Sequence, residues 1–279
     1  MNLVFALASA LAYGVADFSG GLAARRAALF PVLVLSQAAG GFAVAAWAFG
    51  SGTPLPPLAD LAWGLAGGVA GAFGLLLLYR GLARTTVAVV APSSALFAAL
   101  APALAGFAFG ETLSASALAG AALCVPAILL MAGERLGAAS AEKTRSALAH
   151  GVGAGILIGF QLLAVSMAGE DSGVWPLVAA RASAVAVLLV PVAATRSGLG
   201  APLRALPLVL GAGLADSGGT VLFLLATRSG PLALASVVSS LFPAPTVLLA
   251  ALVLKERIPA TRWAGLVLAL AGVALIGLA

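Results

Sequence analysis

Two charged residues lie deep inside long apolar segments of the chain. Arg181 is about seven residues into the segment 174–194, and Asp216 is about eleven residues into the segment 205–226. A charge in hydrocarbon costs roughly 2.5–3.5 kcal/mol on insertion scales, so each residue needs a compensating interaction. The two could form an ion pair that joins two helices. Alternatively, they could hold the carboxylate and the ammonium group of a zwitterionic solute.

Four further polar residues lie in apolar surroundings. Asp17 follows Tyr13 by four residues, which places both on one face of a helix. A carboxylate in such a segment could bind and release a proton, or it could cap the helix end and pair with one of the arginines that follow. Gln37 and Gln161 are amides within apolar segments, where such groups bridge helices or line a cavity.

No constellation in the sequence indicates an enzyme, a metal site or a cofactor. The chain has one cysteine, Cys124, and one histidine, His150, so no internal disulfide and no Cys/His metal site is expected. Glycine-rich stretches occur without a GxxxxGK[ST] motif, which argues against a phosphate-binding loop. The formal net charge is +5, but the basic residues are scattered between apolar runs, so we expect no nucleic-acid partner.

The composition is typical of a membrane protein. Of 279 residues, 62% are hydrophobic and only 8% are charged, and the mean hydropathy is +1.16. A soluble domain has about 25% charged residues. At ~20 residues per crossing, the chain has room for roughly ten helices. The apolar segments are 3–23, 29–49, 58–79, 87–109, 114–133, 149–169, 174–194, 205–226, 231–254 and 261–278.

The two halves of the chain resemble each other when one is shifted against the other without a gap. The shift aligns Gly14 with Gly159, Pro31 with Pro176, Gly74 with Gly219, Phe97 with Phe242 and Glu111 with Glu256. We therefore predict two five-helix repeats, 1–133 and 149–279, joined by a hydrophilic cytoplasmic linker at 134–148. Because five is odd, the second repeat enters the membrane from the opposite side, and the repeats are inverted.

The loop charges support this inversion independently. Of the fourteen Lys and Arg residues, twelve lie in loops on one side of the predicted membrane, Arg228 lies on the other side, and Arg181 lies within a span. Positive charge marks the cytoplasmic side. The bias therefore predicts a cytoplasmic linker and two termini outside.

Inverted repeats are typical of secondary transporters, in which two halves rock around a site near the midplane. Prolines occur in the fourth and ninth segments, at Pro92, Pro102, Pro243 and Pro245, and predict interruptions in this matching pair of helices.

The charged candidates are not repeated. Ser36 and Gly71 stand where the second repeat has Arg181 and Asp216. Such asymmetry suits an asymmetric ligand, although sequence drift also produces it.

The ends of both halves carry a recognisable pattern. The segments from Tyr79-Arg80-Gly81 to Gly110-Glu111-Thr112, and from Ala226 to Lys255-Glu256-Arg257, are each followed by an Ala-Gly helix. They resemble EamA repeats of the drug/metabolite transporter superfamily over essentially the whole chain. The resemblance implies ten helices around a central cavity, alternating access, and export of small metabolites, often amino acids as in YddG-like exporters.

We therefore expect an all-α integral membrane protein, with ten transmembrane helices in two inverted five-helix repeats around a central cavity. It would sit in the bacterial cytoplasmic membrane as a monomer or homodimer and export a small-molecule substrate, an amino acid or related metabolite. A proton-coupled multidrug efflux pump is the alternative. The expected substrate contacts are Arg181, Asp216, Tyr13, Gln37 and Gln161, and Asp17 is the candidate for proton coupling.

Overall fold

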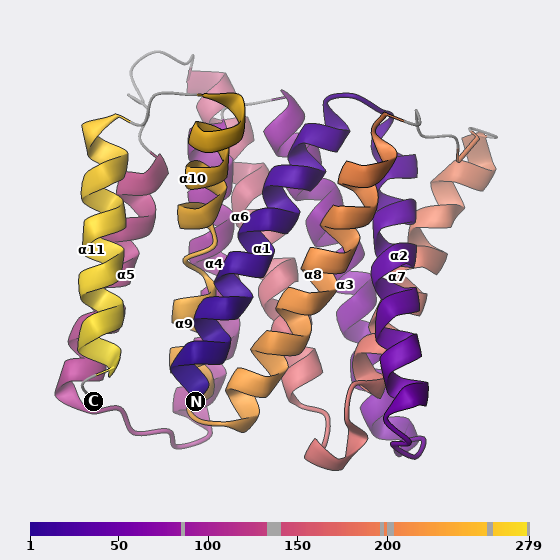
Figure 1. Ribbon diagram of the computed structural model, residues 1–279, viewed down its shortest axis with the longest axis horizontal. Coiled ribbons are helices and arrows are strands. Elements are labelled where there is room, and N and C mark those ends of the chain that lie inside the picture. Colours follow the sequence, from indigo (N-terminus) through magenta and orange to yellow (C-terminus); the bar gives the residue numbers. More distant parts are fainter. Residues whose placement is uncertain (85–86, 133–140, 196–197, 200–203, 256–258, 278–279) are drawn as a thin grey trace.

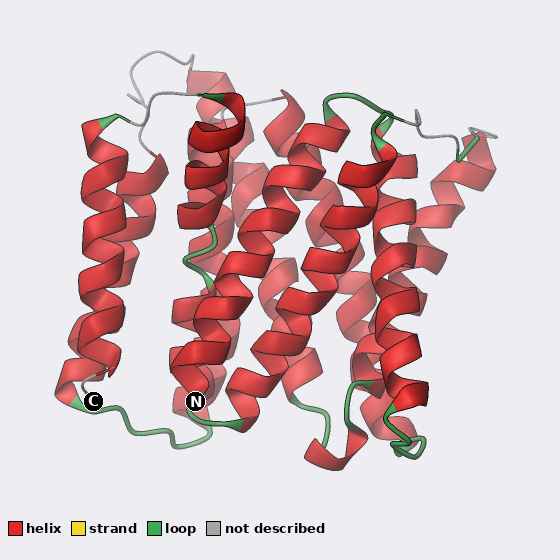
Figure 2. Ribbon diagram, in the orientation of Figure 1, coloured by secondary structure: helices red, strands yellow, loops and turns green. Residues whose placement is uncertain are grey.

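The computed structural model is a bundle of helices that run between two opposite faces (Figure 1). It describes all residues except 85–86, 133–140, 196–197, 200–203, 256–258 and 278–279. Within these described parts, every regular element is a helix (Figure 2). The helices are α1 (Asn2–Ala24), α2 (Leu29–Gly50), α3 (Leu58–Arg84), α4 (Val87–Ala108), α5 (Ala115–Ala132), α6 (Ala141–Ser166), the 3-10 turn η2 (Glu170–Ser172), α7 (Trp175–Thr195), α8 (Leu206–Arg228), α9 (Leu232–Ser239), α10 (Pro243–Leu254) and α11 (Ala260–Gly277).

The helices have the lengths and compositions of membrane crossings. In the described residues, eight spans are long and apolar enough to cross a membrane, and α9 and α10 together form one of them. Two shorter apolar helices, Ala115–Leu130 and Ala260–Ile276, complete a set of ten. A helix satisfies its backbone hydrogen bonds internally, which a lipid environment requires. The prediction of an all-α membrane protein with ten helices is confirmed.

The packing follows a two-fold relation between the halves. Helix α1 packs against α8, and the equivalent helices α6 and α3 pack against each other. Likewise, α2 against α8 is matched by α7 against α3, and α4 against α6 is matched by α1 against the α9–α10 pair. The pairs α2–α7, α4–α9 and α5–α11 join equivalent helices directly. The two halves therefore interdigitate rather than form separate lobes.

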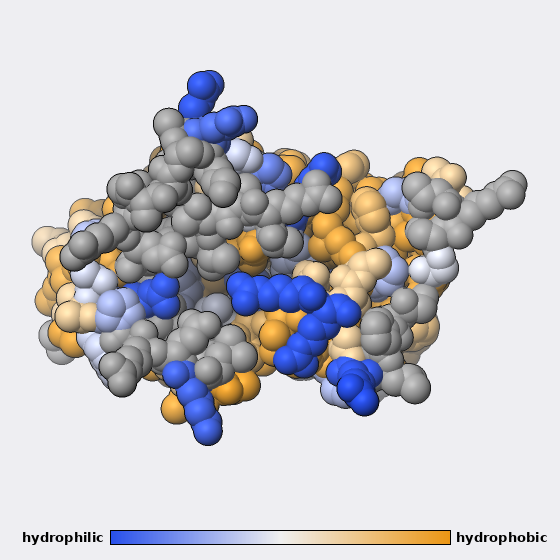
Figure 3. Space-filling view, turned by 90° about the horizontal axis from the view of Figure 1, so that it is seen from above, coloured by the Kyte–Doolittle hydropathy of each residue, from blue (hydrophilic) through white to orange (hydrophobic). Residues whose placement is uncertain are grey.

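The two faces of the bundle differ in charge. Both the start of α1 and the end of α11 lie at one face, at the bottom of Figure 1. The opposite face carries hydrophilic side chains (Figure 3) and is called the basic face here. Its exposed basic residues include Arg25, Arg26, Arg80, Arg145, Arg204 and Lys255. By the positive-inside rule we predict that this face is cytoplasmic. Arg135, Arg196 and Arg257 fall outside the described residues.

The central connection differs from its expected extent. Helix α6 begins at Ala141, so residues 141–148 of the predicted linker are helical. This segment contains Glu142 in its first turn, where a negative charge stabilises the helix dipole. Apolar periodicity could not detect this hydrophilic extension.

The face at which α1 starts and α11 ends is called the acidic face here. It is held together by hydrogen bonds between segments that lie far apart in the sequence. Glu111 accepts hydrogen bonds from the backbone N–H groups of Leu232 and Ala233, at 2.6 and 3.0 Å. It thereby caps the N-terminus of α9 from the other half of the chain, where a negative charge is favourable. Ser172 in η2 donates a hydrogen bond to Asp60 at the start of α3. Glu256, which is the repeat equivalent of Glu111, falls outside the described residues.

Candidate functional site

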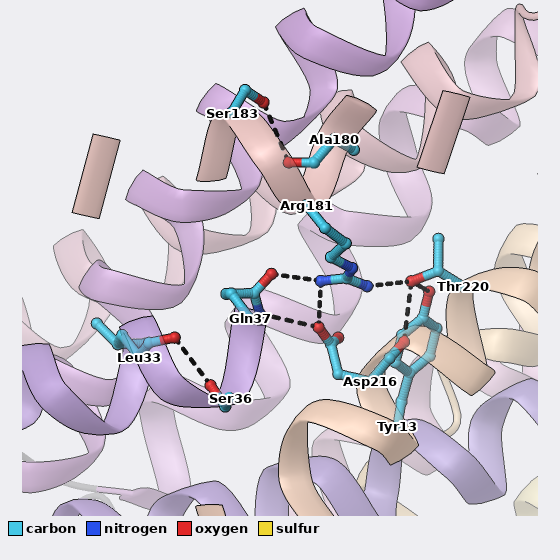
Figure 4. Close-up of polar contacts among 9 residues, drawn as sticks. All are labelled: Tyr13, Leu33, Ser36, Gln37, Ala180, Arg181, Ser183, Asp216 and Thr220. Atoms are coloured by element: carbon cyan, nitrogen blue, oxygen red, sulfur yellow. Dashed lines mark hydrogen bonds and ion pairs between the residues drawn. The ribbon is translucent and has the colours of Figure 1, made fainter. Parts of the chain in front are cut away.

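Arg181 is the centre of a buried group of polar side chains. It is the seventh residue of α7, and only 2% of its surface is exposed. Its Nη1 donates to Gln37 Oε1 and to Asp216 Oδ2, both at 2.5 Å, and its Nη2 donates to Thr220 Oγ1 at 3.1 Å (Figure 4). These charge-assisted bonds are stronger than neutral ones. They stabilise a guanidinium group near the middle of a membrane-spanning helix.

Asp216 divides its two oxygens between different surroundings. Its Oδ2 accepts from Arg181 and also from Gln37 Nε2, at 3.1 Å. No hydrogen bond to Oδ1 is found within the described residues, and 18% of the side chain is exposed. One oxygen is therefore committed to the ion pair, while the other is available to a ligand.

Thr220 completes this group and was not among the sequence candidates. It lies one turn after Asp216 on α8, donates to the Asp216 carbonyl oxygen at 3.0 Å and accepts from Tyr13 Oη at 3.1 Å. The i+4 spacing from a membrane carboxylate was the available signal. We call Tyr13, Gln37, Arg181, Asp216 and Thr220 the polar cluster.

Close contact between α2 and α8 allows Gln37 to reach the polar cluster. A Cβ at Gly213 would overlap the carbonyl group of Ser36, and a Cβ at Gly40 would overlap the carbonyl oxygen of Gly213. The backbones therefore touch where both helices have glycine, as small residues allow in membranes. In the sequence, Gln37 lies between Ser36 and Gly40, and it is therefore at the place where α2 meets α8.

A cavity lies beside the polar cluster, between helices of both repeats. It leaves about 40 Å³ for the centres of water molecules, enough for a few waters. Its polar lining comes from α1, α6, α8 and the end of α9: Tyr13, Asp17, Gln161, Asp216, Thr220, Ser239 and Ser240. Its apolar lining is Leu75, Leu78, Ala98, Ile158, Leu162 and Phe242. Helices of both halves thus contribute to one space.

The structure brings together most of the residues expected from the sequence, in two different roles. Tyr13 and Asp216 belong to the polar cluster and also line the cavity. Arg181 and Gln37 do not line the cavity, but both bind the carboxylate of Asp216. The ion pair between Arg181 and Asp216, one of the two arrangements left open above, is present.

Gln161 and Asp17 lie at the cavity but outside the polar cluster. A Cβ at Gly71 would overlap Gln161 Oε1, so the absence of a side chain at Gly71 makes room for the amide. No ion pair joins Asp17 to Arg25 or Arg26 in the described residues, and both arginines are exposed. The helix-end pairing considered for Asp17 is therefore wrong, because its carboxylate lines the cavity instead.

The predicted interruptions are present in only one of the two helices. Helix α9 ends at Ser239 and α10 begins at Pro243, so the ninth segment is broken. Pro243 lacks the N–H that the Ser239 carbonyl would accept in a continuous helix. Helix α4 contains Pro92 and Pro102 but is continuous, so the prediction for the fourth segment is wrong. The prolines of α4 lie far apart inside the helix, whereas Pro243 and Pro245 both lie in the first turn of α10.

No group of three or more metal-ligating side chains is found in the described residues. The available chemistry is therefore that of hydrogen-bond acceptors and carboxylates at the edge of an apolar cavity. Such a site can bind and release a small polar or cationic solute.

Comparisons with known proteins agree with this architecture. The sequence profile of the EamA-like transporter family matches residues 1–133 and again residues 145–278. No curated protein matches the chain. A crystal structure described only as that of a protein has a similar fold, with a TM-score of 0.76 and 17% sequence identity. The match covers 99% of this chain and 96% of that one, and it extends the similarity in fold over both repeats.

Proposed function

The chain belongs to the EamA-like transporter family, and we propose that it exports small metabolites, amino acids first among them, across the bacterial cytoplasmic membrane. It does so as a secondary transporter by alternating access, with the two repeats, 1–133 and 149–279, as the two moving units. The observation that carries this proposal is the cavity between the repeats, with Asp17 and Asp216 in its lining.

The position of the cavity supports alternating access. It is lined from α1 and α8 and from α3 and α6, and each of these contacting pairs contains one helix from each repeat. Any rocking of one repeat against the other therefore changes the shape of the cavity. Its present volume, about 40 Å³ for water centres, requires such a change before a metabolite can enter.

The polar cluster supports binding of an ammonium group at Asp216. Asp216 lines the cavity, and Arg181 and Gln37 hold its Oδ2, so that Oδ1 remains without a hydrogen bond in the described residues. Arg181 and Gln37 are thus positioning residues, which fix the orientation of the carboxylate. Tyr13 and Thr220 complete the wall beside it, and Gln161 provides an amide from α6.

A proton-coupled multidrug efflux pump is the second candidate, favoured by Asp17. Its carboxylate lines the cavity and has no hydrogen bond to a described residue, so it is available to a proton or to a cationic ligand. A membrane carboxylate of this kind is typical of proton relays in transporters. The rest of the lining is mostly apolar and would suit the hydrophobic part of a cationic drug molecule.

The test is uptake of a labelled amino-acid panel into proteoliposomes, with and without a pH gradient. We expect saturable uptake of some members, and a loss of at least about tenfold in the Asp216→Asn variant. Asp171→Asn, at an exposed position of the acidic face, is the matched control and should retain uptake. If folded protein takes up no amino acid but moves an aromatic cation along the gradient, the second candidate replaces the first.

A further inference from the structure

The cavity has two walls of opposite character. The polar wall consists of Tyr13 and Asp17 on α1 and of Asp216 and Thr220 on α8. The mainly apolar wall consists of Leu75 on α3 and of Ile158 and Leu162 on α6, and α6 also contributes the amide of Gln161. A ligand that fills the space between them meets carboxylates on one side and hydrocarbon on the other.

The two walls are equivalent positions of the two repeats. The shift that aligns Gly14 with Gly159 also pairs Tyr13 with Ile158, Asp17 with Leu162, and Thr220 with Leu75. The duplicated scaffold therefore presents the same positions twice, once with polar and once with apolar side chains. The cavity therefore has a polar side and an apolar side, which two identical repeats would not provide.

The hydroxyl groups around the cavity offer no free protons. Each donates its hydrogen to an acceptor of the protein itself. The bonds run from Tyr13 to Thr220 Oγ1 at 3.1 Å, from Thr220 to the Asp216 carbonyl at 3.0 Å, from Ser239 to the Ala6 carbonyl at 3.4 Å, and from Ser240 to the Ser236 carbonyl at 2.8 Å. Acceptors, by contrast, remain available at the Asp17 carboxylate and at Asp216 Oδ1.

The cavity also lacks a cationic partner for a bound anion. Among the described residues that line it, none is Lys, Arg or His. The nearest cation of the polar cluster, Arg181, is 2% exposed, and both of its Nη atoms are already bonded to Gln37, Asp216 and Thr220. A ligand carboxylate would therefore lose its hydration without gaining a charged partner.

The broken helix does not supply this partner either. A helix N-terminus can hold an anion through its free N–H groups, but Pro243 and Pro245 in the first turn of α10 have none. The N–H of Ala244 is bonded to the Leu241 carbonyl at 2.9 Å, and that of Thr246 to the Phe242 carbonyl at 3.3 Å. Among the described residues of the lining, the amide of Gln161 offers the remaining side-chain donor, and it is uncharged. The site is therefore rich in acceptors and has no charged donor of its own.

We infer that the cavity recognises a protonated primary amine with a compact apolar body, and that it does not recognise a carboxylate. The ammonium group binds at Asp216 Oδ1 and Asp17, and the apolar body packs against Leu75, Ile158 and Leu162. This inference rests on the proposed function and narrows its substrate class from amino acids to organic amines.

The test is calorimetric binding to the purified full chain in detergent, which is independent of passive permeation by neutral amines. The matched ligands are leucine, leucinamide and 3-methylbutylamine, which share one apolar body, and ethanolamine, which replaces that body with a polar one. We expect leucinamide and 3-methylbutylamine to bind at least about tenfold more tightly than leucine, and ethanolamine to bind weakly. Leucine binding as tightly as 3-methylbutylamine would overturn the inference and leave the proposed function standing.

The remaining outcomes are also decisive. Binding of the amines without leucine supports the inference and corrects the amino-acid part of the proposed function. Absence of binding for the whole series contradicts both. An Ile158→Thr variant, which replaces the ethyl branch of this side chain with a smaller, polar hydroxyl group, should lower the preference for 3-methylbutylamine over ethanolamine several-fold. An unchanged preference would show that this wall does not contact the ligand.

Discussion

Helices α3 and α8 occupy equivalent places in the two repeats but present different chemistry to the cavity. Helix α8 packs against α1 and α2, and α3 packs against the equivalent helices α6 and α7. On α8, Asp216 and Thr220 contribute a carboxylate and a hydroxyl group. On α3, Gly71 and Leu75 stand at the same positions. The scaffold is thus duplicated, while the polar groups are not.

The difference shows how one backbone arrangement supports two kinds of wall. The absence of a side chain at Gly71 makes room for the amide of Gln161, which reaches over from α6. Asp216 instead needs Arg181 and Gln37 behind it, because a carboxylate in this environment requires partners. At the position equivalent to Arg181, the Ser36 hydroxyl group donates to the Leu33 carbonyl of its own helix at 3.0 Å, and no hydrogen bond from it to another helix is found in the described residues.

The largest effect should come from removing the cation behind the polar wall. Arg181→Ala leaves the Asp216 carboxylate and Gln37 without their partner, which should cost about 3–5 kcal/mol of unfolding free energy and abolish transport. Thermal unfolding in detergent and uptake into proteoliposomes measure the two effects. The double variant R181M/D216L, which makes this wall apolar like the other one, should recover most of the stability without transport. Recovery of transport as well would reduce the pair to a structural role.

A smaller effect is expected at Asp17, which distinguishes the polar wall from Leu162 on the apolar one. Asp17→Asn removes the carboxylate that is available to a proton or a cation, and a charge-assisted hydrogen bond contributes about 1.5–3 kcal/mol. We expect KM for a transported amine to rise roughly 10- to 100-fold and uptake to lose its response to a pH gradient. Asp216 remains in the cavity, so a pH response that persists in this variant would assign coupling to Asp216 instead.

Thr220→Val should have a moderate effect and make α8 resemble α3 at this position. The variant keeps the shape of the side chain but leaves Arg181 Nη2 and the Tyr13 hydroxyl without their shared acceptor, which should cost about 1–3 kcal/mol. Chemical denaturation measures the loss. Tyr13→Phe removes only one of these bonds and should cost less; an equal or larger loss would show that Thr220 is not the centre of this contact.

The smallest effect should come from Glu111, which lies outside both walls. Glu111→Gln keeps an acceptor but removes the charge that caps α9, and should cost about 0.5–1 kcal/mol. Amide hydrogen exchange at Leu232 and Ala233 should accelerate, while the ligand preference of the cavity stays unchanged. A changed preference would connect the acidic face to ligand selection.

Several features of the site could be predicted from the sequence alone. The depth of Arg181 and Asp216 in their segments placed both near the midplane, and burial then required them to find partners. The i+4 spacing of Tyr13 and Asp17 placed both on one face of α1, and both line the cavity. Helix α9 also ends before Pro243, as proline chemistry predicts.

Other features depend on how the helices are rotated about their axes. In a membrane protein both the buried and the lipid-facing sides of a helix are apolar, so hydrophobic periodicity does not identify the inward side. The sequence therefore gave no reason to separate Arg181, behind the wall, from Asp216, on it. Nor did it connect Gln37 to Asp216, because that contact depends on the meeting of Gly40 and Gly213.

The membrane class, the number of crossings, the duplication and the charge difference between the faces follow from composition, periodicity and order along the chain, and the amino-acid sequence is enough to predict them. The arrangement of the helices in space sets which polar groups meet, and hence that the cavity has one acceptor-rich wall and one mainly apolar wall. Hydropathy fixes how deeply a residue lies in the membrane, whereas close packing at glycines fixes which neighbour it faces.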